Sequence, residues 1–309
     1  MPEREKESMN KIGPDVSSSL IEGAKPYKTE KYAFMIIRRF AKHKMAVGGL
    51  AIIIFLAICA IFAPLIAPYD PYKISNSFSK APSSLHLLGT DHIGRDVLSR
   101  LIYGARVSLT VGLGTVAISI SIGTVLGLIS GYFGGVIDLF IMRVTDIFMS
   151  FPDIVLILVV VSIMGPGMIN IIIVLGLLSW PGVTRLVRGN VLSIKQLDYV
   201  KSAVSIGMKA PEILFAQILP NTIAPVLVNA TSGIASAIIT EAALSFLGMG
   251  VQPPMSSWGN MITDAQSLTV LTSQPWLWLP PGIMIIMCVL SINFIGDGLR
   301  DALDPRNLK

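Results

Sequence analysis

The sequence predicts an all-α integral membrane protein with six transmembrane helices. Of its 309 residues, 52% are hydrophobic and only 14% are charged, whereas an ordinary soluble domain has roughly 25% charged residues. The mean hydropathy is +0.69. Several stretches also approach or exceed the ~20 mostly apolar residues that a helix needs to cross a bilayer.

The expected elements follow from these apolar stretches. Residues 1–44 are polar and form an N-terminal tail, whose last part, 32–44, is amphipathic and is expected to lie along the inner membrane surface. A first span at 45–67 leads to an outside segment, 68–106. The core, 107–296, is followed by a short charged tail, 297–309. We place the five spans of the core at 107–129, 136–164, 168–186, 221–247 and 276–295.

The third of these six spans is less regular than the others. Its wholly apolar part, 154–164, is too short to cross alone, so it spans only if the preceding turns belong to the same helix. Four charged residues are expected near the inner side of this span. Arg143 and Asp146 stand three positions apart, which predicts an ion pair on one helix face. The four are Asp138, Arg143, Asp146 and Asp153.

The outside segment is predicted to contain a short helix lying on the outer membrane surface. After the turn-like LLGTD, apolar residues recur at helical spacing from Ile93 to Ile102, and polar residues occupy the opposite face. Thr90 or Asp91 would cap this helix. For the group Asp91, His92 and Asp96, helix capping and salt links are favoured over cation binding, because no further ligand is well placed.

Most of the 24 Lys and Arg residues fall in segments that would share one side of the membrane. Basic residues are enriched in cytoplasmic loops, so both termini are predicted to be cytoplasmic. The net charge of +5 therefore reflects topology and does not indicate nucleic-acid binding.

Several kinds of chemistry lack their sequence motifs. The chain has no Gly-Lys pair, which excludes a P-loop for ATP, and no H-E-x-x-H or G-x-S-x-G motif. Its two cysteines, Cys59 and Cys288, lie in predicted spans and show neither a disulfide pattern nor zinc spacing. Glu241, inside the fifth span, is open to two interpretations, as a gate residue or as a hydrogen-bond partner across helices.

The stretch DYVKSAVSIGMKAPEILFAQILPN, residues 198–221, interrupts the apolar sequence with a basic passage. Helical spacing predicts an apolar or small-residue stripe, with polar residues facing away. Gly207 ends this helix, a second begins near Ala210 and Pro211, and Leu219-Pro220 marks entry to the fifth span. We expect a short cytoplasmic helix that another protein could grip, and the alternative is a plain interfacial loop. The stripe consists of Tyr199, Val200, Ala203, Val204 and Gly207, and Lys201, Ser202 and Ser205 lie opposite.

Together with four further segments, this loop resembles the inner-membrane permease subunits of ABC importers, in particular the DppC/OppC branch for dipeptides, oligopeptides and nickel. The loop matches in YVKSAVSIG followed by QILPN, and departs from the family pattern at Lys201, Ser202 and Val204. The other segments are GTDHIGRDVLSRLIYGARVSL, WPGVTRLVRGNVL, EAALSFLGMGVQPPMSSWGNM and GDGLRDALDPR. The resemblance runs from about Arg39 to Pro305.

The resemblance implies a type I ABC importer permease fold in the cytoplasmic membrane of a prokaryote. It implies that the chain translocates dipeptides or oligopeptides, carries no catalysis and holds no cofactor or metal of its own. ATP and magnesium would bind to two cytoplasmic ATPase subunits. The remaining partners would be a second homologous permease, an extracytoplasmic substrate-binding protein and membrane lipid, with no nucleic acid.

The resemblance also implies roles for particular residues. Residues 199–207 would be the coupling helix seated in a cleft of an ATPase subunit. Its candidate residues are Tyr199, Val200, Lys201, Ser202, Ala203 and Gly207, together with Leu219 and Pro220. The candidates for binding-protein contact or an outer gate are Asp91, Arg95, Asp96, Arg100, Glu241 and Trp258.

Two alternatives remain open at this point. Within the same family, the substrate could be nickel or another small solute, because the quoted motifs differ little between branches. From a different class, an ion-driven secondary transporter would use charged residues inside the membrane as a relay and would need no docking helix. That relay would comprise Asp146, Asp153 and Glu241.

Overall fold

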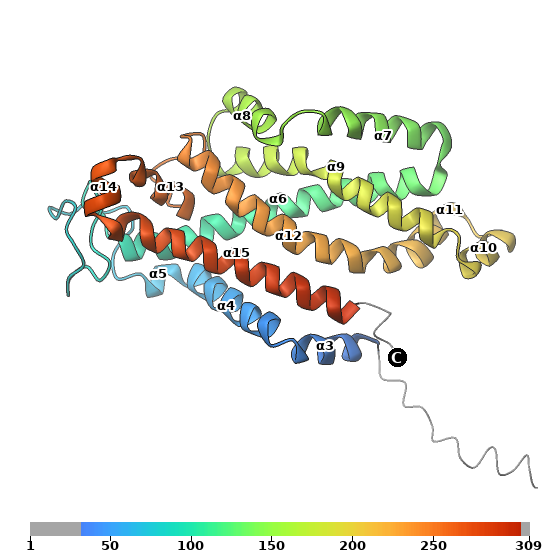
Figure 1. Cartoon of the computed structure of the whole chain (residues 1–309), viewed down its shortest axis with the longest axis horizontal. Helices are drawn as coiled ribbons and strands as arrows, with labels where there is room; N and C mark the ends of the chain where they lie inside the picture. Colours follow the sequence, from blue (N-terminus) through green and yellow to red (C-terminus); the bar gives the residue numbers. More distant parts are fainter. Residues whose placement is uncertain (1–31, 304–309) are drawn as a thin grey trace, which may run out of the picture. The chain divides into compact units, whose positions relative to one another are not determined.

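The computed structural model describes residues 32–303 (Figure 1). The chain divides into two units after Arg38, and the larger unit begins at Arg39. Between residues 39 and 303 every regular element is a helix, and the only β-type pairing is an isolated bridge between Thr90 and Asp96. The predicted all-α class is confirmed. Most of the predicted N-terminal tail, and residues 304–309 of the C-terminal tail, lie outside the described residues.

Helices of very different lengths succeed one another along the chain. α3, Tyr32–Lys42, crosses the boundary between the two units. The next group is α4 Lys44–Ile61, α5 Ala63–Ile66, α6 Val97–Phe133, α7 Gly135–Met149, α8 Asp153–Met164 and α9 Met168–Ile194. After these come α10 Asp198–Ser205, α11 Ala210–Ile213, a π-helical turn Leu214–Ile218 and α12 Leu219–Phe246. The last are α13 Trp258–Ile262, a 3-10 turn Thr263–Gln266, α14 Leu268–Ser273 and α15 Pro275–Leu303.

Five helices of the described chain are long and apolar enough to cross a membrane. They are α4, α6, α9, α15 and the continuous run Ala210–Phe246 that ends in α12. A sixth crossing exists if α7 and α8 count together, but these two helices meet at an angle of 86°. The expected third span is therefore a broken span or a re-entrant loop instead of one straight helix. Pro152 explains the break, because a proline disfavours helical geometry at the residue before it and lacks the N–H of a helical bond.

The separate surface helix predicted within 68–106 is wrong. Asp96, and neither Thr90 nor Asp91, caps the helix, accepting a hydrogen bond from the backbone N–H of Ser99 at 2.8 Å. From Val97 the helix runs unbroken for 37 residues, or about 55 Å. Ile93 lies in the turn before it. The helical periodicity was real, but it belongs to the first turns of the second span.

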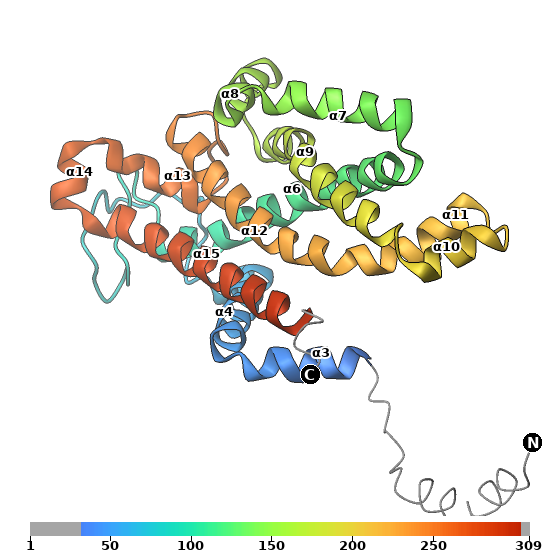
Figure 2. The ribbon, with the colours of Figure 1, turned by 45° about the vertical axis from the view of Figure 1, so that its right-hand side comes forward.

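Helices α6 and α9 make the most extensive contact in the described chain, side by side in Figures 1 and 2. Glycines of α6 lie against valines of α9 along this contact, and a Cβ added at Gly127 would lie 2.6 Å from the Cβ of Val187. The close approach gives the helices van der Waals contact in lipid, where no hydrophobic effect drives association. The facing pairs are Gly123 with Val183, Gly127 with Val187 and Gly131 with Val191.

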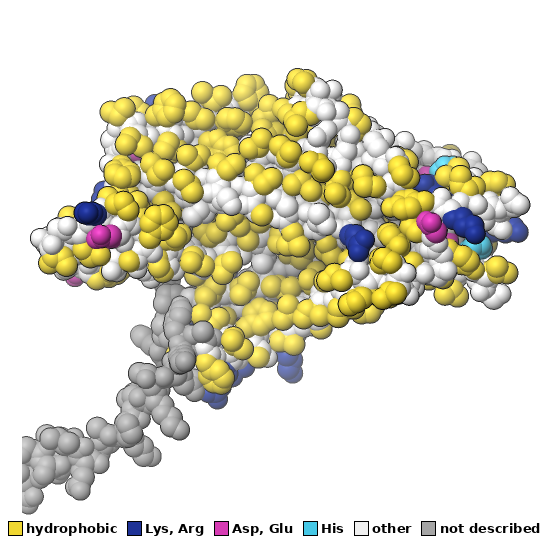
Figure 3. All heavy atoms as spheres, turned by 180° about the vertical axis from the view of Figure 1, so that it is seen from behind, with side chains coloured by type: hydrophobic (Ala, Val, Ile, Leu, Met, Phe, Trp, Pro, Cys, Tyr) yellow, Lys and Arg dark blue, Asp and Glu magenta, His cyan; other side chains and the backbone are white. Residues whose placement is uncertain are grey.

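Hydrophobic side chains cover most of the helix surfaces, as the face in Figure 3 shows, and charged side chains gather mainly toward the two ends. One end carries α13, α14 and the loop 68–96, and the other carries α10 and α11 (Figure 1). We call these the α13 end and the α10 end. Such a surface fits a bundle whose middle faces lipid.

Candidate functional site

The predicted coupling helix is α10, at the α10 end of the bundle. Val200 and Ala203 are buried, and they pack in one cluster with side chains from α6, α9, α11 and α12. The hydroxyl of Tyr199 accepts a hydrogen bond from the amide of Asn221, near the start of α12, at 3.2 Å. α10 is therefore anchored to α9 and α12 by packing and by this bond.

The predicted stripe of α10 does not form one exposed ridge. Its buried members, Val200 and Ala203, hold α10 to the bundle, while Tyr199 and Val204 are exposed at 43% and 54%. Lys201 and Ser202 are also exposed. The surface available to a partner is thus mixed apolar and polar, because the most apolar positions of so short a helix are needed for its own anchoring.

Gly207 ends this helical segment, as predicted. The backbone N–H of Met208 donates to the carbonyl of Ala203 and that of Gly207 to the carbonyl of Val204, the two bonds of a Schellman motif. Gly207 has a φ of +82°, a conformation that glycine adopts without steric penalty. α11 follows at Ala210, and α12 begins at Leu219-Pro220 after one π-helical turn.

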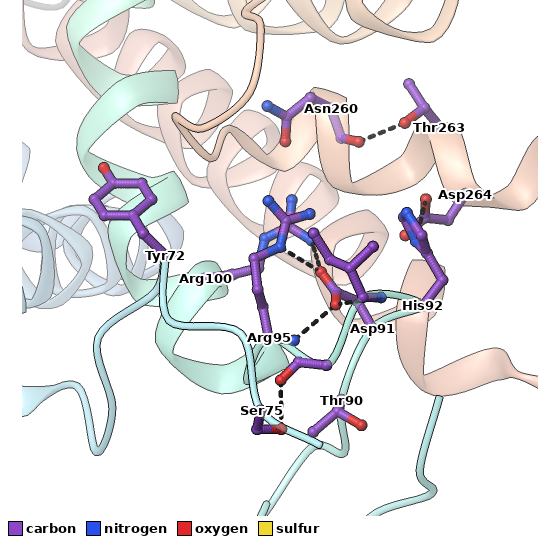
Figure 4. A network of polar contacts seen from close by, with 12 residues as sticks. Tyr72, Ser75, Thr90, Asp91, His92, Arg95, Arg100, Asn260, Thr263 and Asp264 are labelled. Atoms are coloured by element: carbon purple, nitrogen blue, oxygen red, sulfur yellow. Dashed lines mark hydrogen bonds and ion pairs between the residues drawn. The ribbon is translucent and has the colours of Figure 1, made fainter. Parts of the chain in front are cut away.

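Asp91 joins two buried arginines at the α13 end (Figure 4). Its Oδ2 accepts hydrogen bonds from Arg95 Nε at 2.7 Å and from Arg100 Nη1 at 2.6 Å. Its Oδ1 accepts from the backbone N–H groups of Ile93 and Arg95. Asp91, Arg95 and Arg100 are 1%, 7% and 5% exposed, so the predicted salt links exist but are interior.

The electrostatics of this cluster depress the pKa of Asp91. Burial alone would raise it, but the charge of Arg100 and the hydrogen bonds from Arg95 outweigh burial. Asp264 faces the same cluster and lies 3.5 Å from His92. Burial raises the pKa of Asp264, although His92 and Arg100 oppose that shift. A cavity of about 590 Å³ lies beside the cluster, and Arg100 Nε has no hydrogen-bond partner among the described residues.

Glu241 and Trp258 hold α13 into the bundle. The Oε1 of Glu241 accepts hydrogen bonds from the hydroxyls of Ser245 at 2.7 Å and Ser257 at 2.8 Å. The indole of Trp258 donates to the carbonyl of Leu101 at 3.0 Å. Both side chains are fully buried. Of the two interpretations of Glu241, the structure shows the hydrogen bond between elements, which joins Glu241 of α12 to Ser257 at the start of α13.

The charges of the third span are distributed along it, and not gathered on one side as expected. Asp138 binds Arg188 of α9 through two bonds of 2.6 Å. Asp146 pairs with Arg143, as predicted, and also with Arg185 of α9 at 2.5 Å. Asp153 begins α8, beyond the far end of α7 from Asp138.

A row of cavities follows the exposed side of α9 and α12. The first, of about 300 Å³, and the second, of about 200 Å³, share Ser119, Ser179 and Gly182. The second shares Asn229 with a third cavity of about 470 Å³ that reaches Arg300 of α15. On α12 the lining residues recur at helical spacing and so form one face. We call this face, with its α9 neighbours, the polar lane; it comprises Ser179, Gly182, Asn229, Ser232, Gly233, Ser236 and Thr240.

The polar lane differs from the surfaces expected to face lipid. Elsewhere, exposed hydroxyls such as those of Ser121 and Ser162 donate to their own helix backbone at 2.7 Å. Within residues 32–303, four lane side chains make no hydrogen bond. Polar groups without partners are unfavourable in hydrocarbon, so the lane fits contact with water or with another subunit. The four are Ser179, Asn229, Ser236 and Thr240.

The structure brings together only part of the predicted site. Asp91, Arg95 and Arg100 form one cluster, and Asp96 lies beside it, 2.9 Å from His86. All six candidates for the outer contact or gate are buried. The prediction that Arg95, Asp96 and Arg100 lie on the exposed polar side of a surface helix is therefore wrong. The polar lane was missed, although its spacing in α12 was a usable sequence signal.

Comparisons with known proteins show the family of this chain. Residues 123–309 match the family of binding-protein-dependent transport system inner membrane components, and residues 32–82 match the N-terminal transmembrane domain of oligopeptide transport permease C. A dipeptide transport system permease protein of Alkalihalophilus pseudofirmus is 44% identical over 87% of this chain and 88% of its own. A glutathione transport system permease protein of Pectobacterium atrosepticum is 44% identical over 87% and 89%.

A third relative and a solved structure extend the comparison. The di/tripeptide transport system permease protein of Pseudomonas aeruginosa is 43% identical over 86% of this chain and 90% of its own. A chain of the inward-facing MetNI methionine ABC transporter has a TM-score of 0.54 at 20% identity, covering 66% of this chain and 97% of that chain. That likeness shows the fold alone. The family match over residues 123–309 and the identity to these relatives decide the matter: the chain belongs to the family of inner membrane components of binding-protein-dependent transport systems.

Proposed function

We propose that this transport subunit forms half of a translocation pathway for peptides across a cytoplasmic membrane. The observation that carries the proposal is the polar lane along α9 and α12, in which the side chains of Ser179, Asn229, Ser236 and Thr240 make no hydrogen bond inside the described chain. A second, homologous permease facing the lane would complete the pathway. The names of the relatives, which include dipeptide and di/tripeptide permeases, support peptides as the substrate class.

The position of α10 explains how such a pathway would be driven. α10 packs on α9 and α12, the two helices that carry the polar lane. A displacement of α10 by a partner would therefore shift the two lane helices directly. Because interfaces of this kind favour discrete arrangements, the pathway would switch between inward and outward openings.

The partners follow from the same scheme. The chain has no P-loop motif, so we assign ATP and magnesium to two cytoplasmic ATPase subunits that contact exposed residues of α10. The α13 end would then face outward and receive the substrate-binding protein, and both termini would be cytoplasmic. Because the six outer candidates are buried, they would shape the docking surface without forming its contacts.

Purification of the full chain from native membrane in mild detergent tests this proposal. We expect two ATPases and a second permease to co-elute, identified by mass spectrometry, and ATP hydrolysis to rise with a peptide-loaded binding protein. A chain that elutes alone and transports solute with the energy of an ion gradient would contradict the proposal.

A further inference from the structure

The first cavity of the polar lane is the one with a carboxylate in its wall. This partly open cavity has a volume of about 300 Å³ and lies between α6, α7, α8, α9 and α12, and Asp153 itself is exposed. All of its lining residues belong to the described chain, and Asp153 is the only one among them that carries a charge. The cavity therefore has a local negative charge with no cationic side chain in its wall.

The break between α7 and α8 places this carboxylate. Asp153 is the first residue of α8, directly after Pro152. Within residues 32–303 it makes neither an ion pair nor a hydrogen bond, whereas Asp138 and Asp146 on α7 pair with arginines of α9. An intramembrane carboxylate without a partner is unfavourable unless it faces water or a ligand.

Hydroxyl groups surround the same space. Thr115 is 2% exposed, and its Oγ1 has no hydrogen-bond partner in the described chain. The hydroxyls of Ser179, Ser236 and Thr240 also line the cavity without partners there. The apolar wall includes Phe148. Its ring packs edge-on against the ring of Trp180, with 5.5 Å between the two ring centroids. The cavity thus combines several free acceptors, one negative charge and an apolar wall.

This combination suits an ammonium group. An ammonium donates three hydrogen bonds and accepts none, and both carboxylate and hydroxyl oxygens accept, with the charged pair giving the stronger bonds. An anion would instead meet the charge of Asp153 without a balancing cation. The volume is at the lower end of ligand pockets, which run from roughly 300 to 1,000 Å³, so the cavity suits one end of a peptide.

We propose that this cavity binds the protonated amino terminus of a peptide in transit, with Asp153 as its counter-charge and the hydroxyls of Thr115, Ser179 and Ser236 as acceptors. The proposal rests on the proposed peptide transport and names the part of the substrate that the membrane subunit itself recognises. It makes Asp153 a binding residue and distinguishes it from the ion-paired aspartates of α7.

A thiol placed in the cavity would measure its charge. In the assembled complex carrying Cys59→Ala, with the fully buried Cys288 retained, Ser236→Cys is treated with a cationic and an anionic methanethiosulfonate reagent. We expect Asp153→Asn to lower the cationic-to-anionic rate ratio about fivefold, the order expected for one screened charge a few ångströms away. Asp153→Glu should keep the ratio, and so should Asp146→Asn, which removes an acid outside the cavity.

Peptide-dependent ATP hydrolysis then tests the use of the cavity. With increasing peptide-loaded binding protein, we expect Asp153→Asn to lower the maximal rate at least about fivefold without changing the half-saturating concentration, and Asp153→Glu to recover most of the rate. A merely structural role would also lower the amount of assembled complex.

Four results would overturn the inference. An unchanged rate ratio in Asp153→Asn would mean that its charge does not act on the cavity. Failure of both reagents to label Ser236→Cys in the complex would mean that a partner subunit fills the space. Equal rates of peptide-dependent hydrolysis in the wild type and Asp153→Asn would contradict the proposed binding site but not peptide transport. A wild type whose ATP hydrolysis does not respond to peptide would contradict the proposed function as well.

Discussion

At the α13 end, Asp91 is the counter-charge for two arginines that are almost entirely buried. Asp91→Asn would leave Arg95 and Arg100 without that charge. Breaking a buried ion pair in this way destabilises a protein by about 3–5 kcal/mol. We expect a clear drop in the apparent melting temperature in detergent. Asp146→Asn is the control, because its pairs are about half exposed and pairs near the surface contribute at most about 1 kcal/mol.

The same residue predicts a pH dependence. Because the folded chain lowers the pKa of Asp91, folding favours the ionised carboxylate. This stabilisation is present above the pKa of Asp91 in the unfolded chain, about 3.9, and is lost as the pH falls through the lower folded-state value. The difference in melting temperature between wild type and Asp91→Asn should therefore be full at neutral pH and shrink below about pH 4. A difference that stays constant down to about pH 3 would contradict the assignment.

Individual site residues were only partly predictable from the sequence. The pairing of Arg143 with Asp146 follows from spacing within one helix, and it is present. The pairs of Asp138 with Arg188 and of Asp146 with Arg185 join residues 50 and 39 positions apart. Such contacts depend on how α7 lies against α9, which local spacing does not specify.

Among the helices, α6 and α9 depend on three glycines for their close approach. At Gly127 an added Cβ would lie 2.6 Å from Val187 Cβ and 2.8 Å from the carbonyl oxygen of Thr184. Overpacking of this kind typically destabilises by about 1–3 kcal/mol, which exceeds the ~1 kcal/mol that alanine gains over glycine in a helix. We expect Gly127→Ala to lower the apparent melting temperature.

Gly48 offers a matched control for that substitution. It lies inside α4, and a Cβ added there would meet nothing within 4 Å. Gly48→Ala should therefore leave stability unchanged or raise it through helix propensity alone. Equal effects of the two substitutions would show that the α6–α9 contact tolerates a methyl group.

Element boundaries show why the apolar spans were easier to predict than their connections. Five long spans follow from composition, since the length of an apolar run is a local property. The continuation of the presumed surface helix into α6 is consistent with the absence of proline between Val97 and Phe133. The change from polar to apolar composition along this segment obscured that signal. Pro152 is a sequence signal for the break between α7 and α8, but the angle of 86° between these helices depends on packing against α9.

For the whole molecule, the proposed coupling depends on α10 keeping its direction relative to α9 and α12. Gly207 sets that direction at a φ of +82°, and a Cβ added there would meet nothing within 4 Å. The effect of a substitution is therefore one of backbone conformation and not of a clash. A residue other than glycine loses roughly 1–2 kcal/mol in the left-handed region, and asparagine tolerates it better than most.

Gly207→Val and Gly207→Asn accordingly form a matched pair. We expect Gly207→Val to insert into the membrane normally but to redirect α10, so that less ATPase co-elutes and peptide-stimulated hydrolysis falls severalfold. Gly207→Asn should retain most of both, because it can keep the turn. Quantitative mass spectrometry of the purified complexes and hydrolysis rates measure the two effects. Wild-type levels of assembly and ATP hydrolysis in Gly207→Val would contradict the assignment of α10 as the coupling helix. The ATPase contact would then have to lie on another segment of the α10 end.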